Sequence, residues 1–552
     1  MLLETVCAVA LAAGADRPAP IAYRDDVDFV LQKIEQVHPA PYLFVQKSTL
    51  LRDAEQIKAD VPKESLGCAV AKMMALVAEL KDGHSYVDPV NAPGLQEWFP
   101  IRFYSFPDGL YITAAAPEYA ELVGKKVARI GQLSAADAMQ KIAVIQAGNN
   151  ALAAQEGATW LSNAALARAL GAASAEMPVT VSTSNGGTLA RAVRSFSAEL
   201  NDAWMQQGEM FGPRRQDDAQ LYVTAFGRRG PLDYRKADPA LPPHLRYRLP
   251  YFMIEMAAAR LLYFQWNFVQ NWGDEAFPDF TKRLFSVLDH HPDWRLAIDV
   301  RYNSGGNGEL VTDLIRQIIK RDRFDSPGNL FVITGRKTFS AAVDFVGEAK
   351  QWTSAIFVGE PTGAGLNAYG DPQTFETPNL HIRFQISAAY HQHGPSADRS
   401  GAFNPDIPAV MHASEYFRGS DPALDAIREG REVIPIPVLV GQVDGQAAKS
   451  AYERRRALWS GVPWYVPFRE PDMNRAGYHA LRAGKVQDAI TAFEMNATLY
   501  PSSWNVWDSL GEARRVAKDT INAVKSYRKS LDLNPGNQNA KEAIAEMEKI
   551  GH

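Results

Sequence analysis

The chain has 552 residues, of which 46% are hydrophobic and 22% are charged. That length predicts several domains, and that composition is typical of globular proteins, so a disordered or fibrous chain is excluded. The formal net charge is −5 and no basic stripe runs along the sequence, which leaves nucleic-acid binding without electrostatic support. Beyond residue 20, no stretch is long and apolar enough to cross a bilayer.

Residues 1–15 have features of a signal peptide. The segment is largely apolar and ends in Ala13-Gly14-Ala15, the small residues that signal peptidases accept. Glu4 interrupts the apolar run, so an apolar first helix of the folded protein is the alternative. Export to the periplasm or the cell exterior is therefore expected, with the cytoplasm as the alternative. Removal of the leader would take Cys7 away and leave Cys68 without an intrachain partner.

Residues 16–90 are predicted to be helical. Apolar residues recur there at helical spacing, first at Val27, Val30, Leu31, Ile34 and Val37, then at Val70, Met74, Leu76 and Leu80. Residues 91–200 are predicted to form a small β/α module, because "IRFYSF", "GLYITAA" and "KKVARIG" are β-rich and separated by turn residues. Ala-rich helical sequence follows to about Leu170, and then two short strands around Val179 and Ala192.

Residues 201–430 are predicted to hold an α/β core. Residues 200–245 show no clear period and are expected to be a long connection. From Leu261 onward, the apolar strands "RLLYFQWNF", "RLAIDVRYN", "NLFVITG" and "SAIFVGE" alternate with helices. Such alternation favours a layered α/β fold with strands that are at least partly parallel. Residues 431–472 mix Pro, Gly and charged residues and are expected to be a linker.

Residues 473–552 contain an internal repeat. Equivalent residues stand 34 apart in the pairs Gly477 and Gly511, Ala489 and Ala523, Phe493 and Tyr527, and Pro501 and Pro535. This period, with small, aromatic and Pro residues in that order, is the signature of tetratricopeptide repeats, which are helix hairpins. The Ala-rich stretch 538–550 is predicted to be a capping helix. Two repeats are few for a module that stands alone, so it is expected to pack on the enzyme or on a second copy.

Four segments place polar or Gly residues next to apolar strands or helices. Ser340 follows a strand and opens a helix whose N-terminus could stabilise an oxyanion. The turn "NSGGNG" after another strand offers backbone N–H donors. His84, on a turn after a helix, has an ordinary pKa suited to a general base, and a carboxylate such as Asp398 could orient it.

Each of these residues also has a simpler interpretation. Ser340 alone would be a helix cap, His84 a solvated or packed turn residue, and Asp398 a solvated loop charge. The two histidines of "HQH", His391 and His393, have the spacing of alternating strand residues that could bind a metal. The sequence presents no third ligand beside them, so no metal site is predicted.

Taken together, these segments resemble the tail-specific (C-terminal-processing) serine peptidases, a family that includes the tricorn protease core and retinoid-binding relatives. The blocks "DGHS", "DVRYNSGG", "TFSAA", "VGEPTG" and "NPDI" match that family's recurring blocks in order, over about residues 24–412. The resemblance implies a crotonase-like ββα core, peptide-bond hydrolysis and no metal or organic cofactor. The module at 91–200 resembles a degenerate PDZ domain.

The resemblance also assigns roles to residues. Many members of the family use a Ser–Lys dyad, but Gly365 stands where that Lys would fall, in "GEPTGAGL". The tricorn-like branch instead uses a His and an acid, and His84 and Asp398 occupy those places, with Asp406 or Glu360 as alternatives for the acid. The oxyanion donors would be the backbone N–H groups of Ala341 and of Gly305 or Gly306.

Two further hypotheses stay open. A peptidase fold is not proof of hydrolysis, so the chain could be a non-catalytic protein that binds a ligand or peptide. Alternatively, the C-terminal repeats could be the main functional part and act as a scaffold for a protein partner.

Overall fold

The computed structural model describes residues 20–60, 65–90, 94–183, 185–195, 249–325, 328–429, 435–458 and 467–550, together with residues 7, 92, 223–224 and 227–228. The predicted signal peptide, apart from Cys7, and most of the connection at 200–245 lie outside these residues. No helix in the described ranges is long and apolar enough to span a membrane. The chain divides into two compact units, Met1–Phe324 with Phe331–Asp425, and Asp325–Leu330 with Ala426–His552.

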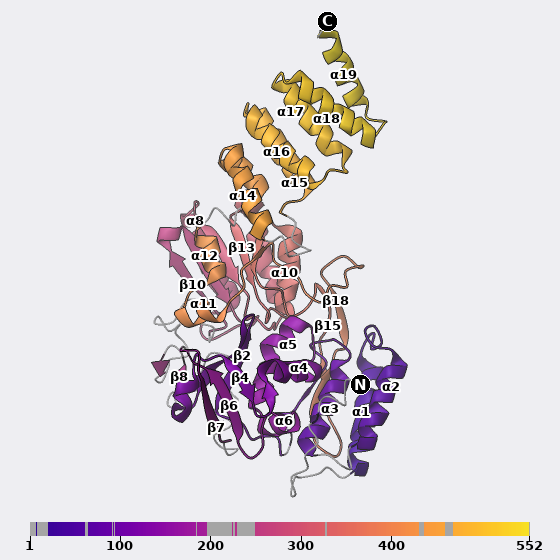
Figure 1. The fold of residues 1–552 in the computed structure, drawn as a ribbon, viewed down its shortest axis with the longest axis vertical. Coiled ribbons are helices and arrows are strands. Elements are labelled where there is room, and N and C mark those ends of the chain that lie inside the picture. The colour runs from indigo at the N-terminus through magenta and orange to yellow at the C-terminus, as the bar shows by residue number, and fades with distance from the viewer. Residues whose placement is uncertain are drawn as a thin grey trace. The chain divides into compact units, whose positions relative to one another are not determined.

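Three helices open the first unit, as predicted, and lie side by side in Figure 1: α1 (Pro20–Val37), α2 (Lys47–Asp60) and α3 (Leu66–Ala78). Helix α3 begins where the Ser65 side chain accepts a hydrogen bond from the Cys68 N–H. Nearly every residue of α3 is buried, which its uniformly apolar sequence explains. A disulfide joins Cys68 to Cys7, with their Cα atoms 5.9 Å apart, so the structure pairs the two cysteines.

The predicted short strands of 91–200 are present in two antiparallel sheets. One has the order β2-β3-β8-β9, and the other β5-β4-β6-β7. Their bounds are β2 (Ile101–Phe106), β3 (Gly109–Ala115), β4 (Val127–Ile130), β5 (Leu133–Ser134), β6 (Met177–Ser182), β7 (Thr188–Val193), β8 (Val223–Thr224) and β9 (Gly227–Arg228). The helices of this region are α4 (Ala135–Ile145), α5 (Asn150–Glu156) and α6 (Ala164–Ala169).

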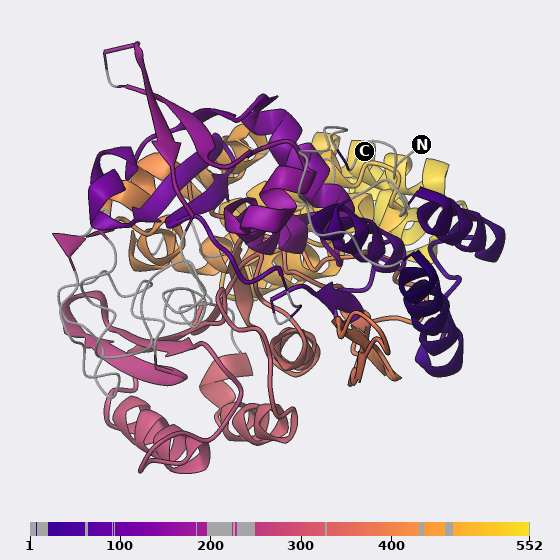
Figure 2. The ribbon, with the colours of Figure 1, turned by 90° about the horizontal axis from the view of Figure 1, so that it is seen from below.

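A six-stranded sheet, in the order β10-β11-β12-β13-β14-β19, forms the predicted α/β core. The pairs β11–β12, β13–β14 and β14–β19 are parallel, and β10–β11 is antiparallel, so the sheet is mixed. Its strands are β10 (Tyr251–Met256), β11 (Leu261–Trp266), β12 (Arg295–Asp299), β13 (Leu330–Thr334), β14 (Ile356–Gly359) and β19 (Ile407–Pro408), and its helices are α8 (Phe277–His290), α9 (Glu309–Ile319) and α10 (Ala341–Trp352). Figure 2 shows this sheet and its helices in pink, beside the purple N-terminal elements.

Two segments after β14 leave the core sheet. Strands β16 (Gln373–Glu376) and β17 (Arg383–Ile386) join β1 (Tyr86–Asp88) in a three-stranded antiparallel sheet next to the N-terminal helices. Strands β15 (Asn367–Gly370) and β18 (Ala389–Gln392) form a separate antiparallel pair. The unit ends with α11 (Ala413–Arg418) and with α12 (Pro422–Glu429), which runs across the boundary.

The second unit is helical, and its first part differs from the expected linker. Residues 431–472 contain α13 (Ile436–Gln442), α14 (Gly445–Leu458) and the start of α15, and α13 and α14 share one apolar core with the helices that follow. The spacing of their apolar residues was masked by Pro and charged neighbours in the sequence. The remaining helices are α15 (Glu470–Arg482), α16 (Val486–Leu499), α17 (Trp504–Val516), α18 (Thr520–Leu533) and α19 (Gln538–Ile550).

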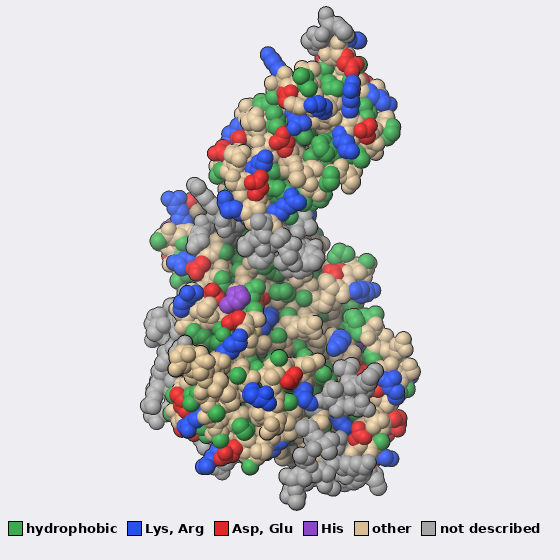
Figure 3. Space-filling view, viewed as in Figure 1, with side chains coloured by type: hydrophobic (Ala, Val, Ile, Leu, Met, Phe, Trp, Pro, Cys, Tyr) green, Lys and Arg blue, Asp and Glu red, His purple; other side chains and the backbone are tan. Residues whose placement is uncertain are grey.

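The 34-residue spacing corresponds to two successive helix pairs, α15–α16 and α17–α18. A Cβ placed on Gly477 would stand 2.5 Å from the Phe493 ring, and one on Gly511 would stand 2.8 Å from the Tyr527 ring. In each helix pair, the glycine of the first helix therefore leaves the space that the aromatic ring of the second helix occupies. In Figure 3, positive and negative side chains are interspersed over the visible face of both units, in keeping with the small net charge.

Candidate active site

Ser340 occupies the turn between strand β13 and helix α10. Its φ of 53° and ψ of −134° lie in a region that non-glycine residues rarely adopt, at a cost of about 1–3 kcal/mol. Its side chain makes no capping hydrogen bond to the helix that it precedes. The helix-cap interpretation of Ser340 is therefore not realised. A strained serine whose hydroxyl is left uncommitted at a strand-to-helix turn is the arrangement that hydrolases use to present a nucleophile.

The turn that carries Ser340 is hydrogen-bonded to the turn after β12. The Thr338 hydroxyl donates to the Val300 carbonyl at 2.8 Å, and the Phe339 N–H donates to the Asn303 carbonyl at 3.0 Å. On the other side, the Thr338 carbonyl accepts from the Gly363 N–H at 2.9 Å. These contacts hold Ser340 beside the glycine turn and support its strained backbone.

Two glycines face Ser340 from that turn, and their N–H groups differ in use. The Gly305 N–H donates to the Asn303 side-chain oxygen at 2.9 Å. Among the described residues, neither the Gly306 N–H nor the Ala341 N–H donates to a protein acceptor. A Cβ on Gly305 would stand 3.0 Å from the Ala341 nitrogen, so the glycine turn lies against the start of α10. In the described structure, Gly306 and Ala341 thus each keep a free N–H donor beside the pocket.

His84 lies on a turn that follows α3, beyond the end of that helix at Ala78. Its ring packs on the ring of Phe339, the neighbour of Ser340, at a centroid distance of 4.2 Å. Its Nδ1 atom is buried and has no hydrogen-bond partner among the described residues. Burial lowers the pKa of His84 below its ordinary value, although Asp82 and the Tyr369 carbonyl act in the opposite direction. A neutral imidazole with a free nitrogen can accept a proton.

Ser340 and His84 line the same pocket. Ala341, Gly306, Gly365 and His391 also line it, so six residues singled out from the sequence come together there. No hydrogen bond between Ser340 and His84 is present in the described part of the chain. Such bonds are often long or absent in unliganded enzymes and tighten when substrate binds, so this arrangement is compatible with catalysis.

Asp82, which sequence reasoning did not single out, is the buried carboxylate next to His84. Its Oδ1 accepts the His84 backbone N–H at 3.0 Å, and its Oδ2 accepts the hydroxyls of Ser85 at 2.5 Å and Ser387 at 2.6 Å. His38 Nε2 lies 3.5 Å from the same oxygen. Burial raises the pKa of Asp82, but these partners outweigh it and hold that pKa below its ordinary value. The Asp directly before "GH" could have been found by asking what holds the turn.

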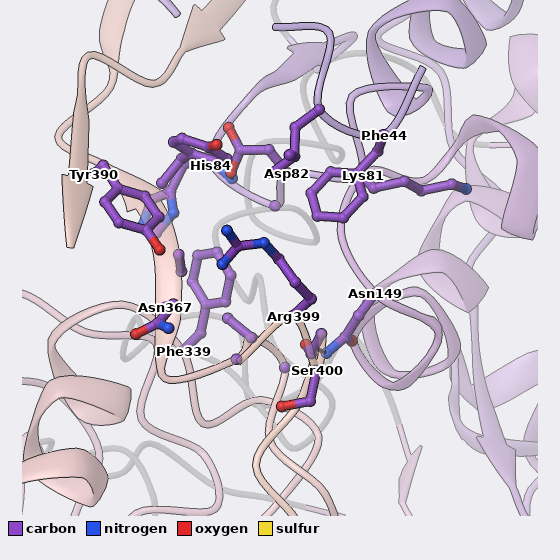
Figure 4. Close-up of a pocket in the computed structure, with 18 of the residues that line it drawn as sticks. Phe44, Lys81, Asp82, His84, Asn149, Phe339, Asn367, Tyr390, Arg399 and Ser400 are labelled. Atoms are coloured by element: carbon purple, nitrogen blue, oxygen red, sulfur yellow. Dashed lines mark hydrogen bonds between the residues drawn. The ribbon is translucent and has the colours of Figure 1, made fainter. Parts of the chain in front are cut away.

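Asp398 lines a second pocket that also includes His84. Its Oδ1 accepts from the Ser400 N–H at 2.8 Å and from the Ser400 hydroxyl at 2.6 Å, and no hydrogen bond links it to His84. Figure 4 shows the side chain of its neighbour, Arg399, extending into this pocket toward His84 and Asp82. The loop therefore reaches the histidine, while the Asp398 carboxylate is engaged within its own turn.

The two alternative acids lie elsewhere. An oxygen of Asp406 accepts the Phe357 N–H at 2.9 Å, and Glu360 lies 3.4 Å from the Arg336 guanidinium. Neither lines a pocket with His84 or Ser340. Each carboxylate has a structural partner away from His84, so neither is in a position to orient the His84 ring.

Gly365 has no room for a lysine. A Cβ at this position would collide with the backbone carbonyl oxygen of Ser400. Lys81 is the lysine that lines the pocket of Figure 4, and there its side chain is directed away from His84. The geometry thus offers Ser340 a histidine rather than a lysine as its proton acceptor.

A buried ion network supports the strand end that precedes the glycine turn. Arg301 donates to Asp299 at 2.9 Å and, with both terminal nitrogens, to Asp421 at 2.8 and 2.9 Å. All three side chains are less than a tenth exposed. The carboxylates hold the pKa of Arg301 well above its ordinary value despite burial, so the guanidinium stays charged, while burial raises the pKa of Asp299.

Comparison with known proteins gives a fold but no close relative. No protein-family model and no curated protein sequence matches the chain. A crystal structure of a CPAF mutant is similar at a TM-score of 0.52, with 13% identity over 74% of this chain and 97% of that chain. Mature CPAF complexed with lactacystin has a TM-score of 0.48 at 12% identity, over 74% of this chain and 98% of that chain. The photosystem II D1 C-terminal processing protease has a TM-score of 0.36 at 11% identity, over 74% of this chain and 96% of that chain. The first of these shows that the chain shares the CPAF fold.

Proposed function

We propose that this protein is a serine hydrolase that cleaves peptide bonds, with Ser340 as the nucleophile and His84 as the general base. The observation that carries the proposal is the strained turn that exposes the Ser340 hydroxyl without a capping bond, in a pocket shared with His84. A strained backbone lowers the stability of the fold, and such strain is concentrated at functional sites. The order of the sequence blocks and the shared fold agree with this assignment.

The chemistry follows from the positions of four groups. The Ser340 oxygen attacks the carbonyl carbon of a bound substrate while a ring nitrogen of His84 takes the hydroxyl proton. The carbonyl oxygen becomes an oxyanion, which the N–H groups of Ala341 and Gly306 stabilise. His84 then gives its proton to the leaving amine, and a water molecule, deprotonated by His84, releases the acyl group from Ser340.

Gly306 is a better second donor than Gly305. The Gly305 N–H is already committed to the Asn303 side chain, and its carbonyl accepts from the Val269 N–H. We therefore assign Gly305 the role of a spacer that lets the turn approach Ser340. Removing one such donor typically costs about 100- to 1,000-fold in kcat.

The third member of the site is open to two assignments. Asp398, proposed from the family resemblance, lines a pocket with His84, and a rotation of its side chain away from Ser400 would be needed for contact. Asp82 is closer along the chain and acts on His84 as a nearby negative charge, besides holding its backbone. We infer that Asp82 is a positioning residue, and we retain Asp398 as the proposed acid that orients the ring.

The family assignment completes the proposal. We infer that the chain is a tail-specific peptidase of the tricorn-like branch, with a crotonase-like core, a degenerate PDZ-like module at 91–200 and tetratricopeptide repeats from residue 473. On this interpretation the repeats bind a protein partner and the enzyme acts outside the cytoplasm. The 34-residue spacing and the glycine–aromatic contacts in the helix pairs support the repeat assignment.

Labelling with a fluorophosphonate probe tests the hydrolase assignment. Wild type should be modified at Ser340, whereas Ser340→Ala should not be labelled and should lose about 10⁴-fold or more in peptide or ester hydrolysis. His84→Ala should lose both labelling and turnover. Ser286→Ala, which changes an exposed serine on α8, is the matched control and should behave as wild type. A folded wild-type protein that resists the probe would instead favour the non-catalytic binding protein.

A further inference from the structure

Three metal-ligating side chains converge beside Ser340. His391 lies on β18, His393 follows that strand, and Asp344 lies in the first turn of α10. One ligand atom from each lies within 4.8 Å of the other two, and His393 Nε2 is 3.0 Å from Asp344 Oδ1. The aspartate supplies the third ligand that the sequence around the two histidines did not reveal, because it comes from a helix distant in the chain.

The fold leaves room for both imidazole rings. His391 and His393 are two residues apart, so they share a side of the chain, and their rings are parallel within 7°. A Cβ on Gly347 would stand 2.6 Å from the His393 Cβ, and one on Gly370 would stand 3.0 Å from His391 Cδ2. Any side chain at these two glycines would displace a ring, so each histidine depends on a specific glycine for its position.

The charge around the three side chains favours a cation. Asp371 directly follows β15, the partner strand of β18, and its Oδ2 lies 3.3 Å from His391 Nε2. Glu309, Asp344 and Asp371 line the pocket that contains Ser340, and no Lys or Arg is among the described residues that line it. A divalent ion at the three side chains would be attracted by these carboxylates, and no Lys or Arg of the described pocket lining would repel it.

We propose that His391, His393 and Asp344 bind a zinc ion, with Asp371 or water as the fourth ligand. Two imidazole nitrogens and one or two carboxylate oxygens are a donor set that zinc takes tetrahedrally, and imidazole disfavours magnesium and calcium, which prefer oxygen. Ligand atoms within 4.8 Å need only small side-chain movements to reach zinc. Asp344 lies one helical turn beyond Ser340, since its N–H donates to the Ser340 carbonyl, so the ion would tie the β15–β18 pair to the helix that carries the nucleophile.

Direct titration with zinc tests the proposal independently of hydrolysis. The full-length chain, carrying Ser340→Ala so that turnover plays no part, is stripped with a chelator and titrated with Zn²⁺ against a chromophoric competitor. One ion should bind per chain, and excess Mg²⁺ should not displace it. His391→Ala and His393→Ala should each weaken binding by at least about 10-fold, because even changes to the outer shell of a metal site cost that much.

The matched control is His381→Ala. His381 Nδ1 pairs with Glu376 at 2.8 Å on the surface, which is an ordinary histidine–carboxylate ion pair without a second histidine. This variant should bind zinc as the parent protein does. Equal zinc binding by all of these proteins, or no stoichiometric binding by the parent, would overturn the proposal and leave His393–Asp344 as an ordinary ion pair.

A second measurement needs no substitution at the site. Cobalt added to the stripped parent protein should give the intense visible absorption of a tetrahedral site, and zinc should abolish it. A spectrum like that of hexaaqua cobalt would contradict the proposal even if a histidine variant failed to fold. Because binding is read on a protein without its nucleophile, a negative result would leave the hydrolase assignment untouched.

Discussion

Gly305 lies directly against Ser340: a Cβ placed on the glycine would stand 2.5 Å from the Ser340 Cβ and 3.0 Å from its Oγ. The glycine also has a φ of 103°, which side chains with a Cβ rarely adopt. The close approach of the two turns, whose residues Gly306 and Ser340 line one pocket, thus depends on the absence of a side chain at Gly305.

Gly305→Ala should therefore disable the site more than it destabilises the fold. We expect kcat/KM to fall by about 100-fold or more, because a displacement of about 1 Å of a catalytic group has effects of that size. Overpacking should cost about 1–3 kcal/mol of unfolding free energy, measured by urea denaturation. Gly273→Ala is the control, since Gly273 has a φ of 60° but no atom within 4 Å of an added Cβ. Equal effects of the two variants on kcat/KM would contradict a role for the close approach.

The pH dependence of hydrolysis should report the burial of His84. A general base must be neutral, so kcat/KM should fall as pH falls through the pKa of His84 in the free enzyme. Burial lowers that pKa, and the acid limb should therefore have its midpoint below the ordinary histidine value of 6.5. A midpoint above that value in the pH profile of kcat/KM would exclude His84 in this environment as the base.

Much of the α/β core was predictable because its strands are continuous apolar runs. Strands buried on both sides need such runs, so β11 to β14 and the helices between them are visible in sequence. The positions of Ser340 and the glycine turn follow from them, since residues after parallel strands gather at one sheet edge. Local chemistry thus singled out Ser340, His84 and the glycine turn, all of which contribute to one pocket, whereas Ala341 was assigned only from the family resemblance.

What the sequence did not reveal depends on contacts between distant segments. The pairing of β17 with β1 and the meeting of Asp344 with His391 and His393 join parts of the chain that no local pattern relates. Asp82 differs, since its hydrogen bond to the His84 backbone spans two residues and was open to local reasoning, whereas only its contact with Ser387 joins distant segments. The assignment of 431–472 as a linker was wrong because Pro and charged residues hid the apolar faces of α13 and α14.

Asp82 and Asp398 can be separated by matched amide substitutions. Asp82→Asn removes a buried charge next to His84, and an NH₂ group in place of Oδ2 can accept from neither Ser85 nor Ser387. If Asp82 positions His84, kcat should fall with little change in KM, and the acid limb should move to lower pH because Asp82 raises the pKa of His84. Asp398→Asn should lower kcat further than Asp82→Asn only if its carboxylate turns to His84 during the reaction. Wild-type kcat in both variants would leave His84 without an orienting acid.

Asp82 should also contribute to acid stability. Its pKa in the folded protein lies below its ordinary value, so its ionised form stabilises the fold above the unfolded pKa, about 3.9. That contribution should be lost as pH falls below this value toward the folded pKa. The unfolding free energy of wild type should therefore drop more steeply below about pH 4 than that of Asp82→Asn. Parallel curves from urea titrations at successive pH values would show that Asp82 titrates alike in both states.

The ion network at Arg301 should be needed to hold the end of β12 beneath the glycine turn. Asp421→Ala leaves the buried guanidinium with Asp299 alone, and loss of one partner from a buried pair costs about 3–5 kcal/mol. Asp293→Ala breaks the Arg260–Asp293 pair, in which both side chains are more than half exposed, and should cost under about 1 kcal/mol. Urea denaturation of the two variants checks the difference. Arg301 directly precedes the glycine turn, so Asp421→Ala should also lower kcat/KM at temperatures where the variant is still folded. An unchanged kcat/KM at those temperatures would show that the network contributes to stability alone.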